Sequence, residues 1–456
     1  MRMFVRPYCM YVCMYVCMQH CLQATFAFYG AHYNLADDRI YFALRNAPRA
    51  ACFDPATKTW ESFGDTFPET QMLENDKWDA AAFSSIDNCL YQFPDHCSVA
   101  HRMLKIDPAN RTAQEVGEDL RPLAPGVNNY LWHAAVANGD GIIFGVPHAA
   151  SQAIRFDPRT NQLKPFGQLE DTGRFKYWDG VLGPSGRYIF CVPVLASRVL
   201  CIDTQELTTK LIGPDFGRGD GANYATQGKW TFGALGGDGC IYAGVGNARR
   251  LLRIDPASMT ASLFGPDLTP FGYMPWISLT TGMDGCLYGT PFLTDRILRI
   301  DPFAGTVSTI GEALPPSQIG KMIFGAVDRD GAVWLLPEQS PARMVRVAPR
   351  RPQTPLLATL LQPQHRAVLH EGLRDMRCYG PALVVALWRE AVRAGGDTTL
   401  VCRLLEAAAT ALPTVVTASI TEDNGSTASM LLRTIVTLVS PQVGASGPRY
   451  YVAGRH

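Results

Sequence analysis

Charged residues are scarce in this sequence, and neither sign is in excess. They make up 18% of the 456 residues, with 41 Lys and Arg against 41 Asp and Glu. Binding to nucleic acid or to an anionic lipid surface generally needs a cationic excess. The balance therefore argues against both as a general function, while local patches stay open. No uncharged apolar run reaches the roughly 18 residues of a spanning helix, so we expect no integral membrane segment.

The sequence also lacks the local motifs of common catalytic and cofactor sites. It contains no glycine-rich phosphate loop, no His-Glu-x-x-His pattern and no Gly-x-Ser-x-Gly turn. Histidine is rare, with nine in total and none between Ala149 and Gln364. We therefore expect no cofactor. The remaining composition, 47% hydrophobic and 10% aromatic, is that of a chain able to form an ordinary soluble core.

The first 23 residues are a low-complexity segment rich in cysteine and methionine. The unit Tyr-Val-Cys-Met recurs, and four cysteines stand four residues apart: Cys9, Cys13, Cys17 and Cys21. We interpret residues 1–23 as an extension outside the folded core. Arg2 and Arg6 before an apolar stretch leave a secretory leader open as the alternative. On a helix the cysteines would share one face, which would suit acylation or a soft metal.

The other cysteines do not suggest a disulfide framework. The total of 13 is odd, and Cys89, Cys240 and Cys286 take the same place in three copies of a repeat. Equivalent places in a repeat array are too far apart to be bridged, so we expect small buried thiols. This favours a reducing, cytoplasmic location. Secretion is the alternative if residues 1–23 act as a signal peptide.

The repeat is about 50 residues long and has two anchors. A short apolar run occurs seven times, at Ile40–Leu44, Leu90–Pro94, Ile142–Val146, Tyr188–Val192, Ile241–Val245, Leu287–Pro291 and Val333–Pro337. An Asp-Pro or similar turn follows each of the first six runs, at Asp54, Asp107, Asp157, Asp203, Asp255 and Asp301. In the last copy Ala348-Pro takes its place. Seven copies of both anchors indicate a repeat architecture.

Each copy contains the signals of four short strands, as the fifth copy illustrates. Trp230–Leu235 and Cys240–Val245 are joined by Gly-Gly-Asp-Gly, whose glycines permit the positive φ of a tight hairpin. Leu251–Ile254 follows, and an Asp-Pro turn leads into Thr260–Phe264. Four antiparallel strands in each of seven copies predict an all-β fold, a seven-bladed β-propeller over residues 24–362.

The motifs resemble those of known propeller repeats. Gly-Gly-x-Gly followed by Ile-Tyr, with an apolar strand ending in Asp-Pro, resembles kelch-like repeats, and Thr59-Trp60 is similar to the kelch tryptophan. The Ile-Asp-Pro ending equally resembles NHL, virginiamycin-lyase-like and cytochrome-domain-like repeats. The resemblance covers about three quarters of the chain. It implies the propeller fold and no single function, because one fold serves many functions.

The C-terminal quarter has a different pattern. The fourth strand of the seventh copy is expected at Pro355–Leu361, where the repeat ends. Over residues 363–440 apolar residues recur at three- and four-residue spacing, which predicts a small α-helical region. Residues 441–456 are expected to form a flexible tail.

Strand order places the long loops on one face of the propeller, which we call the upper face. It carries the connections from second to third strands and from each fourth strand to the next first strand. The long loops are Gly64–Lys77, Gly117–Tyr130, Gly167–Lys176, Gly213–Gln227 and Gly265–Pro275. Binding sites commonly form where variable loops stand on a rigid frame, so we expect the site here.

Aromatic and cationic residues recur where the first strand begins. They are Trp78, Trp132, Trp178, Trp230 and Trp276, with Lys77, Lys176 and Lys229 just before three of them. Innermost strands converge on the central channel, so these residues are candidates for binding a ligand or partner at its upper mouth. The competing interpretation is that the tryptophans wedge between adjacent blades and the lysines are merely solvated.

The recurring acids are expected to be structural. The Asp of each Asp-Pro turn can hold the amides of its own turn, and these turns are spread around the lower rim. The hairpin acids have the same interpretation: Asp140, Asp238, Asp284 and Asp330. We expect no metal, apart from one candidate cluster on the upper rim of blades 2 and 3, formed by His96, His101, His133 and His148.

These observations favour a noncatalytic, monomeric scaffold that binds a protein or peptide through the upper loops. The alternative is a propeller enzyme, a hydrolase or lyase, with a small-molecule site at the upper mouth of the channel. Asp76, Asp179 or Asp220 would then act with the rim histidines as acid and base. A third possibility is a secreted propeller that binds carbohydrate on its tryptophans.

Overall fold

The computed structural model describes residues 11–12, 27–34, 36–68, 76–95, 99–123, 130–171, 173–218, 228–282, 285–316, 322–328, 332–337 and 344–348. The chain divides into two compact units, Met1–Pro352 and Gln353–His456. All described residues belong to the first unit, so the predicted helical region and tail lie outside them. No helix within the described residues is long and apolar enough to cross a membrane.

Four-stranded antiparallel units follow one another along the described chain. The first three are β2 (Phe28–Asn34), β3 (Arg39–Leu44), β4 (Ala50–Asp54) and β5 (Thr59–Phe63); β6 (Trp78–Phe83), β7 (Leu90–Pro94), β8 (Met103–Asp107) and β9 (Thr112–Val116); and β10 (Trp132–Ala137), β11 (Ile143–Pro147), β12 (Gln152–Asp157) and β13 (Gln162–Gln168). Each is a simple meander, which confirms the four short strands predicted for these copies.

The later units repeat this order. They are β14 (Tyr177–Leu182), β15 (Tyr188–Pro193), β16 (Val199–Asp203) and β17 (Thr208–Ile212); β18 (Trp230–Leu235), β19 (Ile241–Val245), β20 (Leu251–Asp255) and β21 (Thr260–Phe264); and β22 (Trp276–Thr281), β23 (Leu287–Pro291), β24 (Ile297–Asp301) and β25 (Thr306–Ile310). The last contains β26 (Met322–Val327), β27 (Val333–Pro337) and β28 (Val345–Ala348). Short 3-10 turns occupy two upper loops, Arg121–Leu123 and Thr269–Phe271.

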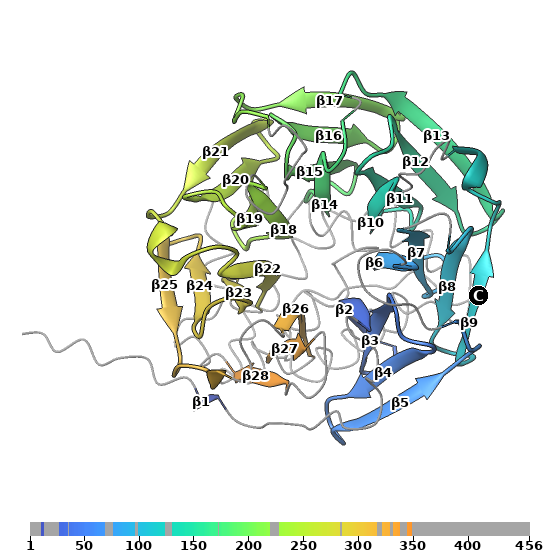
Figure 1. Ribbon diagram of the computed structural model, residues 1–456, viewed down its shortest axis with the longest axis horizontal. Helices are drawn as coiled ribbons and strands as arrows, with labels where there is room; N and C mark the ends of the chain where they lie inside the picture. Colours follow the sequence, from blue (N-terminus) through green and yellow to red (C-terminus); the bar gives the residue numbers. More distant parts are fainter. Residues whose placement is uncertain are drawn as a thin grey trace, which may run out of the picture. The chain divides into compact units, whose positions relative to one another are not determined.

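The units are arranged as the blades of a β-propeller. The first strand of each lies innermost and contacts the first strands of its neighbours, and β2 contacts both β6 and β26, so the ring is closed (Figure 1). Blades 2 and 3 are joined by one parallel bridge between Ala80 and Ala134. Side chains also connect blades: the Gln92 amide accepts from Leu44 N at 2.9 Å and donates to Leu44 O at 3.0 Å.

The turns are held as their sequences predict. In blade 5, Asp255 Oδ1 accepts hydrogen bonds from Ala257 N at 3.0 Å and Ser258 N at 3.3 Å. The other Asp-Pro or Asp-Thr turns are capped in the same way, by Asp54, Asp107, Asp157, Asp203 and Asp301. The interpretation of these carboxylates as structural is confirmed.

A hairpin acid and a buried cysteine lie together at the lower end of blade 5. In blade 5, Asp238 accepts from Cys240 N at 3.1 Å and from the Tyr242 hydroxyl at 2.9 Å. Cys89, Cys240 and Cys286 are buried and unbridged, as expected. Burial raises the pKa of the Cys89 and Cys240 thiols to about 12, so both stay protonated at neutral pH.

The last blade takes its fourth strand from the beginning of the chain. Strand β1 (Tyr11–Val12) pairs antiparallel with β28, with Tyr11 opposite Ala348 and Val12 opposite Val347. The sequence had suggested Pro355–Leu361 for this strand, which lies outside the described residues. Part of the segment predicted to be a separate extension therefore adds to the sheet that also contains β26 to β28 (Figure 1).

Candidate functional site

Four of the five candidate tryptophans form the core of their blades. Trp78, Trp132, Trp230 and Trp276 are at most 2% exposed and begin the first strand opposite the last residue of the second. Each indole N–H donates to the main-chain carbonyl just before or at the start of the third strand, at 2.9, 3.0, 2.9 and 2.7 Å respectively. We call this place in the blade the peg position.

Loop phenylalanines cover three of these pegs from above. The ring of Phe67 lies 5.0 Å from that of Trp78, Phe216 lies 5.0 Å from Trp230, and Phe271 lies 4.8 Å from Trp276, measured between centroids. The pegs thus anchor the upper loops and present no indole face to a ligand.

The three candidate lysines also hold the upper loops. Lys77 Nζ donates to Ala47 O at 2.9 Å and to Pro68 O at 2.6 Å. Lys176 Nζ donates to Gly173 O, and Lys229 Nζ to Gly217 O, both at 2.8 Å. Burial lowers the pKa of Lys176 and of Lys229 to about 8, and the charge of Arg218 adds to the effect at Lys229. These ammonium groups are bound to main-chain carbonyls rather than merely solvated.

Trp178 differs from the other tryptophans. In blade 4 the peg position belongs to Tyr177, which lies opposite Pro193, and Trp178 comes one residue later. Its indole N–H donates to the Tyr29 hydroxyl at 3.1 Å, and its ring lies 4.6 Å from that of His133. The residue after the peg therefore faces the axis of the ring.

Aromatic side chains meet across the axis at this level. Tyr29 of blade 1 lies 5.5 Å from Phe232 of blade 5 and 5.1 Å from Phe324 of blade 7, and the two phenylalanines are 5.1 Å apart. Rings from opposite sides thus fill the centre of the propeller beside Trp178. Among the described residues, these rings occupy the axis at this level.

A buried polar cluster, which we call the acid–imidazole cluster, lies between blades 1, 2 and 3. Arg45 Nη2 lies 2.6 Å from Asp76 and 4.0 Å from Asp95, and Arg45 Nε lies 3.5 Å from Asp79. His133 Nε2 lies 3.2 Å from Asp79. The three carboxyl side chains are 1–4% exposed, and the Arg45 guanidinium also packs over the Tyr29 ring at 4.1 Å.

Burial shifts the protonation of this cluster. It raises the pKa of Asp79, and it raises that of Asp95 well above the usual range with help from the neighbouring Asp79 charge. It lowers the pKa of His133 to about 3, and Arg45 adds to the effect. His133 Nδ1 lies 2.8 Å from Trp178 O, so a neutral ring donates there and turns an unprotonated Nε2 toward Asp79. The geometry suits a proton held between the carboxyl groups and the imidazole.

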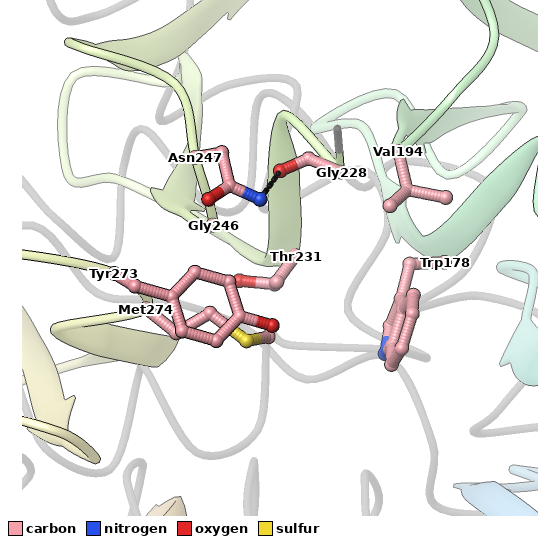
Figure 2. A pocket seen from close by; sticks show the side chains of 8 residues that line it. All are labelled: Trp178, Val194, Gly228, Thr231, Gly246, Asn247, Tyr273 and Met274. Atoms are coloured by element: carbon pink, nitrogen blue, oxygen red, sulfur yellow. Dashed lines mark hydrogen bonds between the residues drawn. The ribbon is translucent and has the colours of Figure 1, made fainter. Parts of the chain in front are cut away.

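A small pocket opens on the upper side of blades 4, 5 and 6 (Figure 2). Tyr273 and Trp178 stand on opposite sides of it, with Thr231 between them (Figure 2). Val194 and Met274 add apolar wall, and Asn247 Nδ2 donates to Gly228 O at 3.2 Å beside Gly246. The lining comes from first strands, second-to-third connections and fourth-to-first connections, the three sources predicted for a site on the upper face.

The pocket is shallow and bordered by exposed apolar side chains. About 180 Å³ of space lies among its lining residues, but this includes open solvent, and the enclosed part has room for only about one water-sized group, far less than a usual small-molecule site. Phe271 and Tyr273 are each 39% exposed and Leu293 is 41% exposed, and Leu293 N donates to Met274 O at 3.3 Å. These are three of the six large hydrophobic side chains that the described residues expose.

The structure brings together only some of the predicted acids and histidines. The rings of His133 and His148 lie 5.1 Å apart, while His96 and Asp220 are outside the described residues. Asp179 lies apart from the cluster, where Asp179 Oδ2 accepts from Gly233 N at 3.0 Å and burial raises its pKa to about 7. Within the described residues, no three His, Cys, Asp or Glu side chains are arranged to hold a metal.

Sequence reasoning did not find Asp79, Asp95 and Arg45. For Asp79 a signal was present, because it follows the peg Trp78 just as His133 follows Trp132 and Trp178 follows Tyr177. The residue directly after a peg faces the axis of the ring, so a polar residue at this position indicates a polar group at the axis. Arg45 and Asp95 lie in loops of different blades and carry no such local mark.

Comparisons with known proteins support the fold. The model of a repeat of unknown function (DUF6923) matches residues 182–332. A search of curated proteins finds no match. Among solved structures, a streptogramin B lyase has a TM-score of 0.56 at 13% identity, over 75% of this chain and 98% of the other.

Other solved structures of similar fold include a second lyase and a chain of the mitotic checkpoint complex. Virginiamycin B lyase from Staphylococcus aureus has a TM-score of 0.54 at 12% identity, over 74% of this chain and 99% of the other. A chain of the mitotic checkpoint complex has a TM-score of 0.52 at 8% identity, over 77% and 99%. At such identities these likenesses show a β-propeller fold alone.

Proposed function

We propose that the chain is a noncatalytic, seven-bladed propeller scaffold that binds a protein or peptide partner on its upper face. An apolar side chain of the partner inserts between Trp178 and Tyr273. The observation that supports this most directly is the pocket itself, because loops of three blades converge on an apolar depression. Its size suits the tip of one side chain better than a whole small-molecule substrate.

The surroundings of the pocket support a macromolecular partner. Phe271, Tyr273 and Leu293 expose apolar surface beside it, where a partner would remove them from water. Buried aromatic anchors commonly carry much of the affinity of an interface. The pegs and lysines beneath fix the loops, so the surface is preorganised and little ordering opposes binding.

Selection of displayed random linear peptides on the full chain tests the proposal. We expect enriched peptides with a shared apolar residue, and we expect Tyr273→Ala and Leu293→Ala to abolish their binding while the melting temperature is retained. Leu263→Ala is the matched control, because Leu263 is 45% exposed on the outer strand β21. Peptides that bind all three variants equally would refute the site.

The enzyme alternative has one observation in its favour, the contact of Asp79 with His133 beside Asp95. A carboxyl and an imidazole sharing a proton resemble an acid–base pair. Their burial, with Asp79 and Asp95 at 1% and His133 at 5%, works against substrate access. An activity screen with Asp79→Asn as the inactive control would support this alternative if turnover depended on Asp79.

A further inference from the structure

We infer that the partner carries an acidic residue beside its apolar anchor, and that its carboxylate meets a basic rim formed by Arg174 and Lys229 above the buried Lys176. This inference rests on the proposed function and names the chemistry of the segment that the pocket takes. It follows from where these three cations lie and from which of them already have anionic partners.

The main chain of Lys229 and Lys176 is hydrogen-bonded to the wall of the pocket. Lys229 N donates to Val194 O and Lys229 O accepts from Gly246 N, both at 2.9 Å, so two lining residues are hydrogen-bonded to this lysine. On the same side, Lys176 O accepts from Val194 N at 3.0 Å. The Arg174 guanidinium lies 5.3 Å from the centre of the Phe175 ring. Phe175 in turn packs against the hydrophobic side chains that surround Trp178.

Two arginines nearby already have anionic partners. Arg218 forms an ion pair with Asp171, and Arg249 forms one with Asp267 at 2.5 Å. In contrast, Arg174, Lys176 and Lys229 form no ion pair with any carboxylate in the described part of the chain.

Burial is the main reason why the pKa of Lys229 falls to about 8; the Arg218 charge adds to the fall and the Asp215 charge opposes it. Lys176 is fully buried and contributes charge from beneath, whereas Arg174 is exposed and Lys229 is half-buried. A carboxylate next to the pocket would therefore find two reachable cations and a third below them.

Electrostatic complementarity then selects the register of the peptide. The apolar anchor fits only the pocket, and an acidic neighbour on one side of it points toward blades 4 and 5. A basic neighbour would meet Arg174 and Lys229 and be repelled. This arrangement separates partners by charge, while the apolar anchor supplies most of the affinity.

Peptides from the random library that require Tyr273 are the probe. We expect Asp or Glu within a few positions of their apolar residue. Replacing the acidic residue by its amide, Asn or Gln, should weaken binding of the peptide to the full chain about two- to fivefold. High salt should remove this difference in affinity between the acid and the amide. Lys229→Gln should abolish the preference and Lys229→Arg should keep it, with Lys164→Gln on the outer strand β13 as the matched control.

The outcomes separate this inference from the proposed function. Peptides that need Tyr273 but bind equally well as acid and amide, or that carry Lys or Arg beside the anchor, would overturn the inference and leave the proposed function standing. Peptides that do not depend on Tyr273 would overturn both. Melting curves of Lys229→Gln and Lys229→Arg identify any loss of loop structure. Arg174→Gln, at an exposed side chain, then gives a second measurement of the preference for the acidic peptide over its amide.

Discussion

Replacing Asp95 by Asn tests the protonation of the acid–imidazole cluster. One guanidinium, that of Arg45, lies within 4.0 Å of three buried carboxyl groups, those of Asp76, Asp79 and Asp95. Burial, and next the Asp79 charge, raise the pKa of Asp95 well above its usual range, so the folded state keeps a proton there. Asn has the same shape, cannot ionise, and carries N–H donors in place of the acid's proton.

The sign and size of the effect follow from linkage. In the unfolded chain an Asp loses its proton near pH 4. Between that pH and the raised pKa of Asp95, the folded state binds one more proton than the unfolded state. Stability therefore falls as pH rises, by up to about 1.4 kcal/mol per pH unit, until the folded carboxyl ionises. Asp95→Asn lacks this loss, so its advantage should be small near pH 4 and grow toward pH 8.

Denaturant unfolding of the wild type and Asp95→Asn at a series of pH values measures the difference. In thermal melts each kcal/mol should appear as about 2–4 °C or somewhat less in a chain of this length. Asp65→Asn, an exposed carboxyl on the upper face, controls for the change in net charge. A variant that is less stable than the wild type at pH 8, or a difference that does not change with pH, would refute the reasoning.

Further predictions concern the scaffold. Trp276→Ala should lower the free energy of unfolding by about 3–5 kcal/mol in denaturant titrations, because it removes a fully buried peg. A decrease of less than about 1 kcal/mol would contradict this role. Gln92→Leu should cost about 2–4 kcal/mol by leaving two buried main-chain groups of Leu44 unpaired, again by denaturant titration. A chain that begins at Ala24 lacks β1 and should melt below the full chain. The Cys240 thiol should resist alkylation at pH 8 until denaturant is added.

Local sequence was enough to predict the blades and their turns. An apolar run, a glycine hairpin and an Asp-Pro turn each depend on interactions between residues close in sequence, as at Asp255 and Asp238. They can therefore be predicted without knowledge of distant contacts. The burial of Cys89 and Cys240 followed from the same repetition. The proposed partner, the compartment and the oligomeric state stay predictions.

The tryptophans show where the local signal became ambiguous. Five share one place in the sequence pattern, yet Trp230 is a buried peg and Trp178 faces the axis. One residue of register separates them, and in a strand a shift of one residue moves a side chain to the other face. Tyr177, not Trp178, aligns with the pegs when the pairing with the second strand is known.

The sequence by itself determined the repeating strands, the turn acids and the upper face as the place where loops gather, because all of these depend on short-range geometry. Only the tertiary structure decided that Arg45 would meet Asp79 and Asp95, that Tyr29 would meet Phe232 across the ring, and that β1 would join the last blade. Closing a ring brings together residues far apart in the chain, and no local pattern specifies which of them will meet.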